Sequence, residues 1–275
     1  MSNLTSPKYP SVKIEARPSH ERGQYQNSWL KAFHSFSVPS YQDKRYMRFG
    51  SIRIINEDRV APSNGFGLHP HSEMEIFTYI VSGELEHKDS MGNVEALKRG
   101  DVQLTSAGTG IRHSESNSNA SHEAHLLQIW AYPSTDKLTP AYYTRHFTDE
   151  EKKDTLVRIV APFNSRGVTS ERDGAGPAPV HSPITLYATL ISPTKSVTHV
   201  FPASVSAEPR KAYVQLPQTS GHNAGEARGA RVRLNGGLEL SEGDAAFVWG
   251  QEGDILEIEN VGSELVAEVL VFDIE

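Results

Sequence analysis

One stretch of the sequence, residues 65–115, most constrains what this chain can fold into. It opens with GFGLHPHSEME, which contains His69 and His71, and it closes with SAGTGIRHSE, which contains His113 and Glu115. Side chains of a β-strand alternate between two faces, so the members of each pair point to the same side. If two such strands line one barrel, three imidazoles and one carboxylate converge, which is a ligand set for a divalent transition metal.

The residues between these two motifs support a barrel. Residues 76–81, IFTYIV, are mostly β-branched or aromatic and end shortly before Gly83, as strands do. The segments DSMGN and RGD read as turns, because glycine and asparagine tolerate positive φ. Short strands separated by turns predict an antiparallel sandwich or barrel.

Several other residues compete for a place at the predicted metal site. The chain has 12 histidines, so two of them at i and i+2 can arise by chance, and the paired His-x-Glu motif is what favours a metal. Glu73 and Glu75 have the same parity as His69 and His71, so either carboxylate could also face the metal. Four further histidines are interpreted as structural or surface residues: His34, His87, His125 and His199.

The composition is that of a polar globular protein. The 275 residues are 37% hydrophobic and 22% charged, and the net charge of −7 disfavours a broad nucleic-acid-binding surface. The absence of cysteine excludes disulfides, thiolate ligands and thiol nucleophiles. The N-terminus lacks the apolar core of a signal peptide, and no run approaches the roughly 18 apolar residues that span a membrane. We therefore expect a cytoplasmic monomer, or a nuclear protein if the source is eukaryotic, that contacts no membrane.

The chain divides by pattern into two halves. We expect a metal-binding domain at residues 1–135, a linker at residues 136–155 and a second domain at residues 156–275. Within the linker, the segment TDEE at residues 148–151 has the form of a capping box and predicts a short helix. From about residue 184 the strand and turn pattern returns without a His-x-His pair, so we expect the second domain to bind no metal.

These motifs also resemble those of a known family. The spacing from the His-x-His pair through Glu75 to Gly83 is similar to the first motif of the cupins, and Gly100-Asp101 followed by His113 is similar to their second motif. The segments HPHSEMEIFTY, EHKDSMGN, SAGTGIRHSE and QIW, in this order, resemble the pirin family within the cupins. The upstream segments FHSFS and FGSIRIINEDRV resemble pirins as well, and the likeness covers residues 15–165.

Similarity to the pirins implies an all-β fold of two jelly-roll-like cupin barrels in tandem, joined by a short helical linker. It implies that one divalent metal is held by His69, His71, His113 and Glu115, with Glu75 as a carboxylate near the site. Such a mixed nitrogen and oxygen set suits Fe(II), while Mn, Co, Ni, Cu or Zn are alternatives. The resemblance further implies a quercetin 2,3-dioxygenase-type reaction, in which O2 opens a flavonol and carbon monoxide leaves. Glu115 or Glu75 would then take the proton of the flavonol hydroxyl.

The sequence is also compatible with two other functions. Resemblance to eukaryotic pirins implies an iron-dependent, redox-sensitive nuclear co-regulator that binds a transcription factor without turnover. The negative net charge and the missing basic cluster of a nuclear protein count slightly against this role. The third possibility is a metal-stabilised structural protein that has no partner. Oxygen consumption with quercetin separates the enzyme from the other two.

Overall fold

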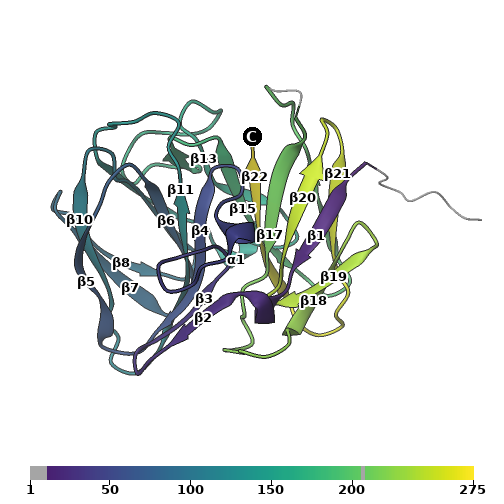
Figure 1. The fold of residues 1–275 in the computed structure, drawn as a ribbon, viewed down its shortest axis with the longest axis horizontal. Helices are drawn as coiled ribbons and strands as arrows, with labels where there is room; N and C mark the ends of the chain where they lie inside the picture. Colours follow the sequence, from purple (N-terminus) through teal and green to yellow (C-terminus); the bar gives the residue numbers. More distant parts are fainter. Residues whose placement is uncertain (1–10, 206–207) are drawn as a thin grey trace, which may run out of the picture. The chain divides into compact units, whose positions relative to one another are not determined.

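The computed structural model describes residues 11–205 and 208–275 as an almost entirely β structure (Figure 1). These residues form the strands β1 to β22, so the predicted all-β class is confirmed. The one α-helix in the described ranges, α1 (Asp149–Lys152), follows Thr148 directly, and two short 3-10 turns lie at Ser19–Glu21 and Lys44–Tyr46. None of the described helices has the length and apolar character needed to cross a membrane.

The described residues form two compact units whose boundaries differ from the predicted ones. The N-terminal unit contains residues 21–149 and 158–186, and the C-terminal unit contains residues 11–20, 150–157 and 187–275. Strand pairing explains the difference. β1 (Lys13–Arg17) pairs with β20 (Ala245–Gly250), and β12 (Ala141–His146) pairs with β9 (Asp101–Ser106). Part of the expected linker is therefore a strand of the N-terminal unit, because its backbone hydrogen bonds are made there.

The N-terminal unit is a β-barrel made of two antiparallel sheets. The larger sheet has the strand order β12-β9-β6-β11-β4-β3-β2. The smaller sheet has the order β5-β10-β7-β8, and its four strands are labelled in Figure 1. Besides β9 and β12, these strands are β2 (Gly23–Gln26), β3 (Leu30–His34), β4 (Ile52–Val60), β5 (Asn64–His71), β6 (Glu75–Ser82), β7 (Glu84–Asp89), β8 (Val94–Lys98), β10 (Ile111–Asn117) and β11 (Ala124–Ala131). A parallel pair of strands, β13 (Val157–Pro162) and β14 (Ala178–Val180), accompanies them, and β14 contacts β9 and β12.

The C-terminal unit repeats the plan of a larger and a smaller sheet. Its larger sheet contains the strands β1-β20-β17-β22-β15 in this order, and its smaller sheet has the order β16-β21-β18-β19. The remaining bounds are β15 (Ile184–Ile191), β16 (Ser196–Val200), β17 (Arg210–Gln215), β18 (Arg228–Leu234), β19 (Leu238–Glu242), β21 (Ile255–Asn260) and β22 (Ala267–Ile274). The predicted tandem of two barrels is confirmed.

The interiors of the two barrels differ in chemistry. One part of the N-terminal barrel is filled by apolar side chains from both of its sheets: Leu30, Ala32, Val60, Ile80, Leu85, Leu97, Ala124 and Leu126. Each fully buried leucine or isoleucine stabilises the fold by roughly 2 kcal/mol, so this apolar cluster is a main source of the barrel's stability. The apolar cluster of the C-terminal barrel is larger and includes Val214, Val232, Leu256 and Val271. Both groups of potential metal ligands in the described ranges lie in the N-terminal unit.

Candidate metal centre

Three histidines of the two predicted motifs come together on the smaller sheet of the N-terminal unit. β5 and β10 are antiparallel neighbours, and His69 lies directly opposite His113 in their register. The Nε2 atoms of these two side chains are 3.1 Å apart. The ring of His71 lies 4.8 Å from each of the other two rings. One nitrogen of each side chain lies within 4.8 Å of the other two, so this histidine cluster can serve one ion.

A β-bulge sets the direction of His69. The register of β5 shifts so that His69 lies opposite His113 while Phe66 lies opposite Glu115, and the two residues between are exposed. The carbonyl oxygen of Gly67, inside this bulge, accepts a hydrogen bond from Nδ1 of His69 at 2.7 Å. Because a carbonyl can only accept, Nδ1 carries the proton and Nε2 keeps the lone pair that a metal requires.

Two glycines let the chain approach as closely as this cluster needs. An added Cβ at Gly65 would lie 2.3 Å from the carbonyl oxygen of Glu115 on the neighbouring strand. Gly108, in the turn before β10, has a φ of 46°, and its added Cβ would lie 1.9 Å from the carbonyl oxygen of Leu138. A side chain at Gly65 would therefore displace β10, which carries His113, and one at Gly108 would collide with the backbone of Leu138 beside the turn that leads into β10.

The surroundings keep the imidazoles of His71 and His113 neutral. Burial and three neighbouring imidazoles lower the pKa of His113 to about 3. Burial and the proximity of His69 lower the pKa of His71 to about 4. Neutral imidazole is the form that binds a metal, so protons compete for these nitrogens only in acid.

Glu115 is held by side-chain amides beside this cluster. The carboxylate is buried inside the barrel, where Oε1 accepts a hydrogen bond from Nε2 of Gln103 at 2.5 Å and Oε2 accepts one from Nε2 of Gln128 at 2.7 Å. Burial raises the pKa of Glu115 to about 7, although the two amides favour its charged form. Glu115 forms a second group of potential ligands with His113 and His87. The structure therefore places it next to His113, but does not place it within one group with all three clustered histidines.

His87 belongs to this second group of potential ligands, although the sequence pattern predicted only a structural role for it. Its Nε2 donates to Oδ2 of Asp89 at 3.3 Å, which leaves Nδ1 unprotonated and 4.0 Å from Oε1 of Glu115. This Nδ1 is buried and has no hydrogen-bond partner among the described residues. The ring also stacks on Tyr142, with centroids 4.7 Å apart. The alternation His87-x-Asp89 was the available signal, because it places both side chains on one face of β7.

The other two candidate carboxylates lie elsewhere. Glu73 and Glu75 were predicted to share a strand face with His71. They do not continue its strand, because β5 ends at His71 and Glu73 takes a φ of 53° in the turn before β6. The Oε2 atom of the buried Glu75 accepts hydrogen bonds from Oγ of Ser106 at 2.9 Å and from the backbone nitrogen of His181 at 3.0 Å. Glu75 belongs to neither group of potential ligands. The alternation that seemed to align it with the histidines holds within a strand and does not continue through a turn.

The donor atoms of the histidine cluster fit a divalent transition metal. Metal–nitrogen bonds are about 2.1 Å long, so two nitrogens on one ion are commonly about 3 Å apart. The Nε2 atoms of His69 and His113 have this separation. The Nδ1 atoms of His87 and His113 are buried without hydrogen-bond partners in the described ranges, and such atoms are places where an ion or water completes a site.

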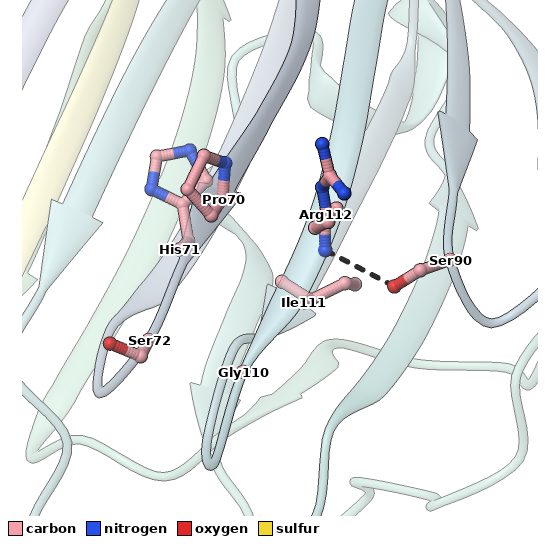
Figure 2. Close-up of a pocket in the computed structure, with 7 residues that line it drawn as sticks. All are labelled: Pro70, His71, Ser72, Ser90, Gly110, Ile111 and Arg112. Carbon is pink, nitrogen blue, oxygen red and sulfur yellow. Dashed lines mark hydrogen bonds between the residues drawn. The ribbon is translucent and has the colours of Figure 1, made fainter.

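His71 is the one member of the histidine cluster that lines a neighbouring pocket (Figure 2). The pocket has a volume of about 510 Å³ and is lined by Pro70, His71, Ser72, Ser90, Gly110, Ile111 and Arg112. Figure 2 shows Pro70 and His71 on one strand and Arg112 on its neighbour, where the backbone nitrogen of Arg112 donates to Oγ of Ser90 at 3.1 Å. The ring of His71 also packs edge-on against Trp130, with centroids 4.7 Å apart. A pocket of this size suits a small aromatic molecule.

Comparison with known proteins decides the family. The sequence profile described as Pirin matches residues 15–131. A protein named quercetin 2,3-dioxygenase from Escherichia coli (strain K12) is 33% identical over 261 residues, which cover 95% of this chain and 98% of that protein. The chain belongs to the pirin family.

Solved structures agree with the fold of this pirin. The crystal structure of YhhW from Escherichia coli matches it with a TM-score of 0.79 at 32% identity, covering 96% of this chain and 98% of that one. The crystal structure of bacterial pirin YhhW in complex with nickel(II), from the same organism, matches with a TM-score of 0.78 at 32% identity and covers 95% and 99%. Membership of the pirin family, predicted from the motifs, is therefore confirmed.

Proposed function

We propose that this pirin is a metal-dependent dioxygenase that opens the ring of a flavonol such as quercetin with O2. The observation that carries the proposal is the cluster of three histidines, of which His71 lines an open pocket, with the buried Glu115 beside it. The 33% identity over 95% of the chain to a protein named quercetin 2,3-dioxygenase supports the same reaction. We propose Fe(II) as the ion, with the following ligands: His69, His71, His113 and Glu115.

The ion supplies one part of this chemistry. When bound, a divalent metal is a Lewis acid with positions open to O2 and to the chelating oxygens of a flavonol. The chain supplies the rest by holding its donors ready. His69 is fixed by the carbonyl oxygen of Gly67, and Glu115 is fixed by two amides, so little side-chain freedom is lost when a ligand enters.

Glu115 is the proposed acceptor of the flavonol hydroxyl proton. Its two oxygens are held at the side of His113 by Gln103 and Gln128, and both amides donate to it. Donors of this kind stabilise the carboxylate, which is the form that can accept a proton, while burial keeps it basic. Glu75 lies with Ser106 and His181, so we do not give it the role of base.

Aromatic side chains near the cluster are suited to a planar substrate. Trp130 packs edge-on against His71, and both residues are half-buried, so part of each ring is open to solvent. A flavonol in contact with these rings would displace water from the histidine cluster and bury its own apolar faces.

Oxygen uptake and carbon monoxide release test this function directly. Iron-loaded protein mixed with quercetin in air should consume O2 and release carbon monoxide in equal amounts. The same protein stripped by a chelator should do neither, and restoring iron should restore both. If iron-loaded wild-type protein shows no uptake with quercetin or other flavonols, the proposed activity is wrong.

A further inference from the structure

A row of polar side chains crosses the larger sheet of the N-terminal barrel at one level. The strand register places these residues opposite one another in turn across five neighbouring strands: Gln103, Thr78, Gln128, Asn56 and His34. Their strands are β9, β6, β11, β4 and β3, which are adjacent in the sheet order. Five consecutive polar residues inside a barrel need hydrogen-bond partners, because burying unsatisfied polar groups is costly. We call this set the polar row.

One end of the polar row has all its partners. Nε2 of Gln103 donates to Oγ1 of Thr78 at 3.0 Å, and that hydroxyl donates to Oε1 of Gln128 at 2.7 Å. The amides of Gln103 and Gln128 donate to Glu115, as described for the metal centre. This end of the polar row therefore serves the metal centre.

The other end of the polar row has unpaired atoms. Nδ1 of His34 is 2.9 Å from Oδ1 of Asn56, an acceptor, so Nδ1 carries the proton and Nε2 has a free lone pair. This Nε2 is buried and has no hydrogen-bond partner among the described residues, and the same is true of Oδ1 of Asp58. His34 is 7% exposed and Asp58 is 4% exposed. His34 and Asp58 lie diagonally across the neighbouring strands β3 and β4, and their unmet hydrogen-bonding capacity indicates a place for a ligand or water.

Asp58 lies among apolar neighbours that cannot pair with its carboxyl group. Asp58 lies two residues from Asn56 in β4, on the same face, and it lies directly opposite Ala32 in β3. On its other side Asp58 lies opposite Leu126 in β11, and neither alanine nor leucine can form a hydrogen bond with a carboxyl group. Ala32 belongs to the apolar cluster that fills one part of the barrel interior, so His34 and Asp58 also face this interior.

The residues between this end of the polar row and the metal centre are partly exposed to solvent. Asn56, Gln128 and Trp130 are half-buried although they lie on the interior face of a central part of the sheet. Trp130 contacts His71 of the histidine cluster, and Gln128 follows two residues before it on the same face. One continuous wall therefore runs from the histidine cluster to His34.

We propose that His34 and Asp58 form a subsite that binds a phenolic hydroxyl of the substrate remote from the oxygens that chelate the metal. The proposal rests on the proposed flavonol activity. A hydroxyl group both donates and accepts, so it can donate to Nε2 of His34 and accept from the carboxyl group of Asp58. Burial, together with the nearby Glu115 and Glu57, raises the pKa of Asp58 to about 8, so near neutral pH its carboxyl group carries the proton that it donates.

Two probes separate this subsite from the metal centre. Quercetin has hydroxyls on both of its ring systems, whereas 3-hydroxyflavone keeps the metal-chelating oxygens and lacks every other hydroxyl. The dissociation constants of both are measured by absorbance on the nickel-loaded chain under nitrogen, so that no turnover occurs. In His34→Phe and Asp58→Ala, the quercetin dissociation constant should rise roughly three- to tenfold, as expected for one lost hydrogen bond. The constant for 3-hydroxyflavone should stay within about twofold of the wild-type value.

Three further variants and measurements make the result specific. Asp58→Asn keeps a hydrogen-bond donor and should bind quercetin as the wild type does. His199→Phe changes an equally buried histidine of the C-terminal unit and should change neither constant. Nickel affinity, measured by competition with a chelator, should be unchanged in all four variants.

The possible outcomes are distinct. Equal weakening of both flavonols in His34→Phe, or unaltered quercetin binding in both His34→Phe and Asp58→Ala, would overturn the subsite and leave the proposed function standing. If the wild-type chain binds neither flavonol, the proposed function fails and the subsite that rests on it fails too. The proposal is supported if His34→Phe and Asp58→Ala bind quercetin more weakly but bind 3-hydroxyflavone as before, and if Asp58→Asn binds quercetin as the wild type does.

Discussion

Oε2 of Glu115 accepts a hydrogen bond from Nε2 of Gln128 at 2.7 Å, and this bond joins the two sheets of the N-terminal barrel across its interior. Glu115 belongs to β10 of the smaller sheet and Gln128 to β11 of the larger sheet. The carboxylate beside the histidine cluster is thus positioned by a strand that contributes no ligand. Partners of this kind orient a metal ligand and maintain its charge.

Replacing Gln128 by leucine should weaken metal binding. The variant removes one of the two amides that hold Glu115, so the carboxylate gains freedom and its charged form loses a donor. We expect the nickel dissociation constant to rise by roughly ten- to a hundredfold, the usual cost of losing such a partner. Competition with a chelator measures the nickel dissociation constant. The control is Gln24→Leu, which changes an exposed glutamine of the same unit. Equal affinity in wild type and Gln128→Leu would show that Gln128 does not position the ligand.

Removing His113 should abolish stoichiometric metal binding. His113 is the residue common to both groups of potential ligands, so its loss leaves neither group complete. We expect purified His113→Ala to contain far less than one nickel ion per chain by elemental analysis, while its circular dichroism remains that of a β protein. The double variant His69→Ala/His113→Ala extends the test to the C-terminal unit, which we propose binds no metal. A full equivalent of tightly bound metal in the double variant would contradict both assignments.

The two buried carboxylates should differ in their effect on turnover. Glu115→Gln keeps the size of the side chain but removes its charge and basicity, so oxygen uptake with quercetin should fall by roughly a hundredfold or more. Glu75→Gln changes a carboxylate that is bonded to Ser106 and His181, and it should bind metal and turn over nearly as the wild type does. Rates are compared per bound iron, so that loss of metal is not mistaken for loss of the base. A dead Glu75→Gln beside an active Glu115→Gln would invert the assignment.

Asp58 should make the stability of the metal-free protein depend on pH. Burial first, and then the charges of Glu115 and Glu57, raise the pKa of Asp58 from 3.8 to about 8. Between these values the folded protein keeps a proton that the unfolded chain releases. The contribution of Asp58 to the free energy of unfolding therefore falls as pH rises through this range and is level above it.

Urea unfolding of the wild type and Asp58→Asn, with chelator present, measures this contribution. Because asparagine does not titrate, the free energy of unfolding of the variant should rise relative to that of the wild type between pH 5 and pH 8. The slope cannot exceed about 1.4 kcal/mol per pH unit, the limit for one proton. Parallel pH profiles of the two proteins would mean that Asp58 titrates normally in the folded state.

Local sequence determined much of this protein. Alternating strands separated by turns are short-range properties, and they predicted a β structure. The motifs, which are also local, carried the resemblance to the pirin family that implied the tandem barrels. The convergence of His69 and His113 was predicted on the condition that their strands line one barrel, and the pairing of β5 with β10 meets this condition. Likewise, the echo of the strand pattern after residue 184 was enough to predict the second barrel.

Only the tertiary structure decided which other side chains share the site. The predicted position of Glu75 depended on parity through a turn, and the positive φ of Glu73 breaks that parity. The polar row depends on the register of five strands, which are brought together from distant parts of the sequence and whose pairing no local pattern fixes. The same is true of the two amides on Glu115 and of the unpaired atoms of His34 and Asp58. Alternation along a strand is a local property, whereas the neighbours of a side chain inside a barrel are set by long-range strand pairing.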